Sequence, residues 1–200
     1  MNERVVIVDY GAGNLTSVKN AFAAIGVEAE VTSDPAALTA ADRIVFPGVG
    51  AAKSAMENLR KMGLVEPIRA AAASGKPFLG ICLGMQILFS RSEEDGGVGL
   101  LGVLEGQVRR FPDLPGFKVP EIGWNDVRID DATLRLKSGL EYYFVHSYCA
   151  DVVPETVGFT EYAGVTFTAM VRRGRLWACQ FHPEKSGRVG LDLLKERMAC

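Results

Sequence analysis

The sequence predicts an α/β protein in which a mixed sheet carries helices on both faces, folded as a single domain over residues 1–200. In the first half of the chain, short β-branched runs alternate with amphipathic segments, as in parallel sheets covered by helices. In the second half, runs rich in β-branched and aromatic residues are separated by Gly, Pro and Asp, as in antiparallel strands. A chain of 200 residues can bury a sizeable core.

The first half alternates strands and helices up to Ile81. The expected strands are 4–10, 27–32, 43–46 and 77–81. The expected helices are 17–25, 53–61 and 67–73. Gly26 and the pair Ser74-Gly75 follow two of these helices, where residues of this kind commonly end a helix. This order predicts the parallel part of the sheet.

The second half begins with a polar loop at 92–97. The expected strands are 108–111, 124–129, 142–148, 165–171 and 176–181. Residues 171–179 predict a hairpin that turns at Arg173-Gly174, and residues 187–198 predict a closing helix. No internal repeat, low-complexity tract or linker interrupts this pattern.

Composition excludes several classes of function. Apolar residues make up 48% and charged residues 23%, and the net charge of −2 favours neither nucleic acid nor a membrane surface as a partner. The amino terminus lacks the layout of a secretory signal, and no window is long and apolar enough to span a bilayer. Four cysteines without a CxxC motif and two histidines argue against a metal site and an exported disulfide scaffold. We therefore expect a cytoplasmic protein.

The stretch GICLG places Cys82 between Gly80 and Gly84, where a strand is expected to become a helix. Small residues around a nucleophile on such a turn are the pattern of the nucleophile elbow. Glycines permit a sharp, strained backbone there, and the N-terminus of the next helix would favour a thiolate and help to stabilise an oxyanion. A buried structural cysteine is the alternative, because free cysteines are among the most buried residues.

A thiol nucleophile needs a base, and the chain has two histidines. His182 follows an expected strand and precedes Pro183, so it belongs to a strand-end loop of the kind that carries sites in α/β sheets. Glu184 lies two residues further on and can orient the imidazole, as the third member of a triad does. His146 lies inside an expected strand, and we expect it to be a packed, hydrogen-bonded histidine.

The stretch PGVG follows the third expected strand. Gly48 and Gly50 can bring backbone N–H groups close to a substrate carbonyl, so this segment is a candidate oxyanion hole. A plain tight turn is the alternative.

These motifs, in their order along the chain, resemble class I (triad) glutamine amidotransferases: PGVG at 47–50, GICLGMQ at 80–86 and FHPEKS at 181–186. Other stretches resemble, within that class, the glutaminase subunits of imidazole glycerol phosphate synthases, a family of the histidine pathway. These are DYGAGNL (9–15), KVPEIGWN (118–125), YYFVHSY (142–148) and QFHPEKSGRVG (180–190). The resemblance extends from the first strand to the last helix. It implies a three-layer, flavodoxin-like fold with a mixed sheet.

The resemblance also implies roles. Cys82 would attack the side-chain amide of glutamine, His182 would activate the thiol and protonate the departing ammonia, and Glu184 would orient His182. The resulting thioester would be hydrolysed to glutamate, and no cofactor is expected. The implied substrate-binding residues are Gly48, Val49, Gly50, Gln86, Glu94, Ser147 and Tyr148, with Glu94 suited to hold the substrate ammonium.

The resemblance further implies a partner, a TIM-barrel cyclase that forms a heterodimer with this chain and receives the ammonia. Asn14, Trp124 and Lys185 fall where the family meets its cyclase, and in the family a peptide flip at 48–50 is part of activation by the partner. One position departs from the family: Glu121 stands where many members carry His in P-H-M-G-W-N. Independently, the chain has no Walker A loop and no spare acceptor domain, so an acceptor site is expected on another chain.

Other functions stay open at this stage. Gly11-Ala12-Gly13 lies between a strand and a helix, with Glu28 or Glu30 near the next strand, as in a dinucleotide-binding domain, but Thr16 replaces the third glycine of that motif. A non-catalytic binding module is a second alternative, against which the intact triad residues argue. The glutaminase subunits of the pyridoxal-phosphate or purine pathways are a third, disfavoured by GWN and FVHSY.

Overall fold

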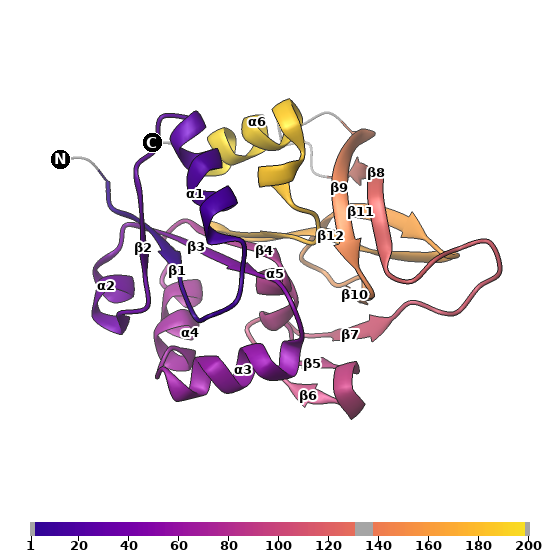
Figure 1. Cartoon of the computed structure of the whole chain (residues 1–200), viewed down its shortest axis with the longest axis horizontal. Helices are drawn as coiled ribbons and strands as arrows, with labels where there is room; N and C mark the ends of the chain where they lie inside the picture. The colour runs from indigo at the N-terminus through magenta and orange to yellow at the C-terminus, as the bar shows by residue number, and fades with distance from the viewer. Residues whose placement is uncertain (1–2, 131–137, 199–200) are drawn as a thin grey trace.

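A long mixed sheet crosses the molecule and carries helices on both faces (Figure 1). The computed structural model describes residues 3–130 and 138–198. Along the main path of the sheet the strand order is β2-β1-β3-β4-β13-β12-β10-β7-β5-β6, and β8, β9 and β11 branch from β12. The predicted α/β class and the change from parallel to antiparallel pairing are both confirmed.

The parallel part of the sheet consists of four strands that are buried on both faces, as their apolar runs predict, and of the partly exposed edge strand β2. It contains β1 (Val5–Val8), β2 (Ala29–Thr32), β3 (Arg43–Gly48), β4 (Phe78–Cys82) and β13 (Leu176–Cys179). β4 is central, with β3 and β13 as its parallel neighbours. β3 is longer than predicted and includes Pro47 and Gly48, because its pairing with β4 continues to Gly48 opposite Cys82.

The antiparallel part contains more strands, several of them shorter, than the sequence predicts. It contains β5 (Arg91–Ser92), β6 (Val98–Gly99), β7 (Gln107–Arg110), β8 (Glu121–Ile129), β9 (Leu140–His146), β10 (Tyr148–Ala150), β11 (Thr156–Tyr162) and β12 (Val165–Arg173). The predicted strand 142–148 is two strands, because the chain leaves the β8 pairing at His146 and joins β7 at Tyr148. The predicted hairpin is confirmed, with Arg173 opposite Leu176 and Gly174 at φ 62°.

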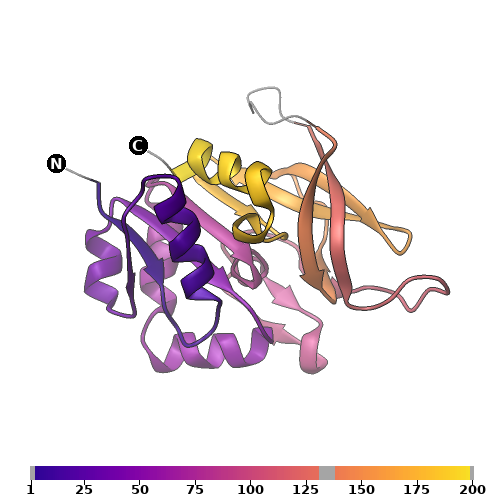
Figure 2. The same ribbon diagram turned by 45° about the horizontal axis from the view of Figure 1, so that its top comes forward.

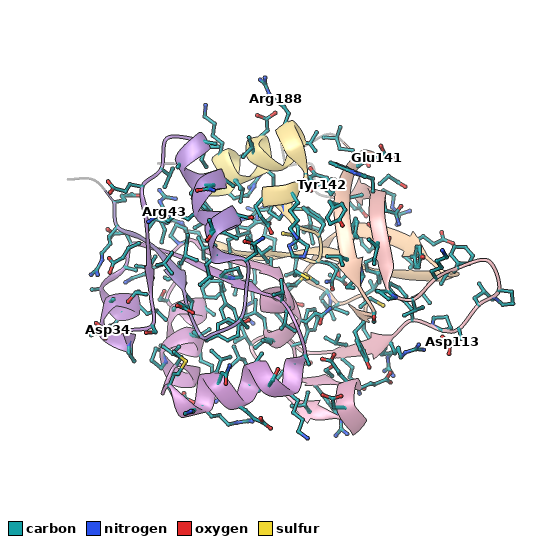
Figure 3. The ribbon with its side chains drawn as sticks, viewed as in Figure 1. Asp34, Arg43, Asp113, Glu141, Tyr142 and Arg188 are labelled. Atoms are coloured by element: carbon teal, nitrogen blue, oxygen red, sulfur yellow. The ribbon has the colours of Figure 1, made fainter. Side chains whose placement is uncertain are left out.

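The helices form the two outer layers (Figures 1 and 2). They are α1 (Leu15–Ala24), α2 (Pro35–Ala40), α3 (Ala52–Lys61), α4 (Val65–Ala73), α5 (Leu83–Ile87) and α6 (Gly187–Met198), with short 3-10 turns η1 (Glu94–Gly96) and η2 (Pro183–Lys185). α2 was not predicted. It begins at the N-cap Asp34, whose carboxylate accepts from the N–H of Ala36 at 2.9 Å (Figure 3). None of the helices in the described residues is long and apolar enough to cross a bilayer.

Two hydrophobic cores lie on opposite faces of the sheet. One is closed by α2, α3, α4 and α5, and the other by α1, α6 and the β8–β9 ribbon. In the second core Tyr142 of β9 stacks on Phe181 with ring centroids 4.1 Å apart, beside α6 (Figure 3). Because Phe181 directly precedes His182, this packing fixes the segment that leads into the candidate site.

Candidate active site

Cys82 is the last residue of β4 and immediately precedes α5. Its backbone has φ 53° and ψ −112°, a conformation that residues other than glycine rarely adopt. Strain of this kind at a strand-to-helix turn is the geometry of the nucleophile elbow. The sharp turn predicted from GICLG is therefore present, and its left-handed residue is the cysteine itself.

Gly80 and Gly84 provide space and do not carry the strained backbone, so the sequence argument was wrong in that detail. Neither has a positive φ. A Cβ at Gly84 would lie 1.8 Å from the carbonyl oxygen of Phe46, and a Cβ at Gly80 would lie 2.9 Å from the Cβ of Ala178. The missing side chains let α5 pack directly against β3 and let β4 lie against β13.

The candidate base is buried beside β9. The backbone N–H of His182 donates to Tyr143 at 2.9 Å, and Nδ1 lies 2.7 Å from Oε1 of Glu184. The side chains of His182 and Glu184 are 2% and 1% exposed. A carboxylate accepts, so Nδ1 carries the hydrogen, and Nε2 is the nitrogen that faces Cys82.

The electrostatics of this pair favour a charged imidazole. Burial lowers the pKa of His182. The negative charge of Cys82 and the hydrogen-bonded carboxylate of Glu184 raise it by more than burial lowers it, so the pKa rises from 6.5 to about 10. Burial raises the pKa of the Cys149 thiol to about 12 and also raises the pKa of the Cys179 thiol. Cys82 lines one cavity together with His182, and neither Cys149 nor Cys179 is in the lining of that cavity.

A cavity of about 430 Å³ opens over Cys82. Its lining is Val49, Gly50, Cys82, Leu83, Gln86, Glu94, Pro120, Val145, His146, Ser147, Tyr148, His182 and Lys185. The structure thus brings most of the predicted substrate-binding residues together with the nucleophile and the base. Gly48 is not in this lining and pairs with Cys82 in the sheet, and Glu184 lies behind His182. Gly50 has φ 97°, which only glycine adopts readily.

Glu94 is fixed at the N-terminus of α3. Its Oε2 accepts from the N–H of Ala52 at 2.6 Å, and the N-cap residue of that helix, Ala51, offers no side-chain acceptor. The pKa of Glu94 is raised, chiefly by burial. The hydrogen bond from Ala52 lowers this pKa, and the nearby charge of Asp95 raises it. The second carboxylate oxygen stays available for a cation in the cavity.

The side chain of Gln86 can only accept a hydrogen bond from a ligand, because both hydrogens of its amide nitrogen already have partners. Its Nε2 donates to the carbonyl of Tyr148 at 2.7 Å and to Oε1 of Gln180 at 2.9 Å, which uses both hydrogens. The amide oxygen of Gln86 therefore remains as the group that can meet an N–H of a bound molecule.

His146 is packed and hydrogen-bonded, as predicted. Its Nδ1 lies 2.8 Å from the carbonyl of Tyr148, and its Nε2 lies 3.1 Å from Oε2 of Glu121, with both side chains buried. Asn125 also donates to Glu121, at 2.8 Å. Glu121, which departs from the family pattern, is thus the buried partner of His146.

Of the residues expected to meet the cyclase, Lys185 also lines the cavity over Cys82, whereas Trp124 and Asn14 are not in its lining. Trp124 is 53% exposed and packs edge-on against Tyr143, and Nζ of Lys185 lies 5.9 Å from the centroid of the same ring. Trp124 and Lys185 therefore share one surface. Asn14 is exposed and caps α1 by accepting from the N–H of Ser17, and α1 contacts η2.

Tyr10 and Gln180 are buried polar residues near Cys82 that the sequence analysis did not assign. Oη of Tyr10 occupies the space of a Gly48 side chain, 2.2 Å from the position of its Cβ, and has no hydrogen-bond partner among the described residues. Burial and then the charge of Cys82 raise the pKa of Tyr10. Gln180 lies two residues before His182, a spacing that places alternate side chains on one side of an extended chain.

The fold and this cluster are those expected of a cysteine-dependent enzyme that cleaves or transfers amides. A family model described as Glutamine amidotransferase class-I matches residues 6–198. The chain belongs to the class-I glutamine amidotransferase family.

Within this family, the chain is similar over nearly its full length to proteins named as one particular subunit. The imidazole glycerol phosphate synthase subunit HisH of Moorella thermoacetica is 50% identical over 198 residues, covering 96% of this chain and 92% of the relative. The subunit of the same name from Streptococcus sanguinis is 45% identical over 194 residues, covering 96% and 94%. A chain in the structure of PurLQS from Thermotoga maritima superposes with a TM-score of 0.75 at 20% identity, covering 99% and 98%, which shows the fold alone.

Proposed function

We propose that this chain is the glutaminase subunit of an imidazole glycerol phosphate synthase and belongs to histidine biosynthesis. The observation that carries the proposal is the full-length similarity, at 45% and 50% identity, to two relatives named as that subunit. The family match over 6–198 supports treating the whole chain as one amidotransferase domain. The free state of the described cysteines is consistent with a cytoplasmic location.

The Cys82, His182 and Glu184 cluster supplies the chemistry. The Cys82 thiolate attacks the side-chain carbonyl carbon of glutamine, and His182 gives its Nε2 proton to the leaving nitrogen, so that ammonia departs and a thioester forms. Water then attacks the thioester and gives a proton to Nε2 of His182, the C–S bond breaks with its electron pair returning to the Cys82 thiolate, and glutamate leaves. Glu184 holds the imidazole through Nδ1 at 2.7 Å and stabilises its charge.

The cavity supplies substrate binding. The free oxygen of Glu94 meets the α-ammonium of glutamine, and the amide oxygen of Gln86 accepts from a substrate N–H. Ser147 and Tyr148 also line the cavity, and backbone N–H groups at 48–50 stabilise the oxyanion.

The partner is a TIM-barrel cyclase that receives the ammonia. Trp124 and Lys185, which share one surface around Tyr143, form the centre of the interface, and Asn14 contributes from the start of α1. Ammonia released into bulk water would be diluted and protonated, so an acceptor docked beside the cavity is required for synthesis.

Cys82→Ala tests this function in the complex with the cyclase. Glutamine-dependent synthesis should be lost, while synthesis from added ammonia should survive, because only the ammonia source is removed. Cys149→Ala is the matched control, a buried free cysteine outside the cavity lining, and should retain both activities. Glutamine-dependent turnover by Cys82→Ala would refute the assignment of the nucleophile.

A further inference from the structure

Gln180 is a fully buried amide that follows β13 and immediately precedes the segment of the base. Its backbone N–H donates to the carbonyl of Ala169 at 2.9 Å, so the residue is firmly held in the sheet. A buried amide side chain needs partners for both its donor and its acceptor. The identity of those partners determines what Gln180 does.

The orientation of the Gln180 amide is determined by its neighbours. The carbonyl of Tyr148 can only accept, so the end of Gln86 that lies 2.7 Å from it must be Nε2. That same nitrogen lies 2.9 Å from the Gln180 side chain and must therefore meet Oε1. Nε2 of Gln180 is then directed at the Cys82 sulfur, 3.7 Å away. The hydrogen bonds form one chain from Tyr148 to the sulfur, with one allowed orientation.

We propose that Gln180 is a further catalytic residue, which donates a hydrogen bond to the Cys82 sulfur and stabilises it as a thiolate. The proposal rests on the proposed function, in which Cys82 is the nucleophile. A hydrogen bond to an ionised acceptor is about twice as strong as one between neutral groups, so the contribution is largest when the sulfur is charged. The sulfur is charged before attack on the amide and again when the C–S bond of the thioester breaks.

The same hydrogen bonds connect the nucleophile to the substrate site. Gln180 holds Gln86 with its acceptor, and this leaves the Gln86 oxygen facing the cavity. If Gln180 had only a structural role, its removal would affect stability through the lost hydrogen bonds and would not affect the reactivity of the sulfur. A donor to the sulfur additionally affects thiolate reactivity, which can be measured apart from stability.

Gln180→Glu is the sharpest test, because it keeps the shape and the acceptor for Gln86 but replaces the donor to the sulfur. The readout is the rate of Cys82 alkylation by iodoacetamide from pH 6 to 9, followed by mass spectrometry of the peptide that contains Cys82. The rate at pH 7 should fall at least about tenfold, and the pH profile should move to higher pH. In the complex, kcat should fall with little change in KM for glutamine.

Gln180→Met is a second, uncharged variant that removes the donor, and it should slow alkylation in the same direction. Thr160→Val is the matched control, since it removes one buried hydrogen bond, to the carbonyl of Asp126, away from the cavity. It should lower thermal stability and leave alkylation unchanged. If both Gln180 variants alkylate with the unmodified rate and pH profile, the inference is overturned while the proposed function stands. Failure of the unmodified complex to use glutamine for synthesis, while it still uses added ammonia, would overturn the proposed function itself.

Discussion

Gly84→Ala should damage both stability and catalysis, because the added methyl group has no room. Its Cβ would lie 1.8 Å from the carbonyl oxygen of Phe46 and 2.9 Å from the carbonyl carbon, both backbone atoms that cannot rotate away. To restore ordinary contact, α5 must move from β3 by roughly 1.5 Å. Overpacking of this kind costs about 1–3 kcal/mol.

The displaced helix also carries the nucleophile, since Cys82 is the N-cap residue of α5. For a protein of this size, 1–3 kcal/mol corresponds to a melting temperature lower by roughly 2–12 °C. A misplacement of about 1 Å can cost on the order of 100-fold in rate. We therefore expect kcat/KM for glutamine to fall by roughly 100-fold, measured with the cyclase present, together with a lower melting temperature by calorimetry.

Two control variants separate these effects. Gly99→Ala places a methyl group where nothing lies within 4 Å and should change neither quantity. Gly158→Ala overpacks β11 against Met170, with a Cβ contact of 2.9 Å away from the cavity, and should lower the melting temperature without loss of kcat/KM. The reasoning about the elbow is refuted if Gly84→Ala behaves like either control.

Three further predictions concern charge. Glu94→Gln should raise KM for glutamine more than it lowers kcat, because the carboxylate acts in binding; an unchanged KM would remove Glu94 from the site. Lys185→Ala should lower the ratio of cyclase-stimulated to basal glutaminase rate, and an unchanged ratio would exclude Lys185 from activation. His182 has a pKa raised from 6.5 to about 10 in the folded chain, so its contribution to the free energy of unfolding is full below pH 6.5 and is lost as pH rises through about 10. The stability advantage over His182→Gln, measured by urea unfolding, should therefore shrink between pH 7 and 10, and a constant difference would contradict the shift.

Local signals predicted the elements that are strongly patterned. The buried runs of β1, β3, β4 and β13 and the amphipathic helices α1 and α3 were all recognised. α2 was missed although Asp34-Pro35 is an N-cap followed by proline at the first helical position, a recognisable start signal. β11 was missed because Gly158 interrupts its alternation, and that glycine is explained by the close contact with Met170.

The candidate site was predictable where its residues are marked by their own neighbours. Cys82 lies between glycines, and His182 and Glu184 are close in sequence at a strand end. Glu94 is different: it was assigned only from the family resemblance, since its position depends on an N–H donated by Ala52, 42 residues away. Such partners are set by packing across the fold, and no local pattern contains them.

The order of the central strands explains why the cluster forms at this edge of the sheet. β3, β4 and β13 are adjacent and parallel, so their carboxyl ends meet. β3 brings Gly48 opposite Cys82, and the segment after β13 brings Gln180 and His182 to the other side of the sulfur. A cysteine held at φ 53° costs about 1–3 kcal/mol and persists only where its surroundings determine it. The two buried strands on either side of β4, β3 and β13, provide that constraint.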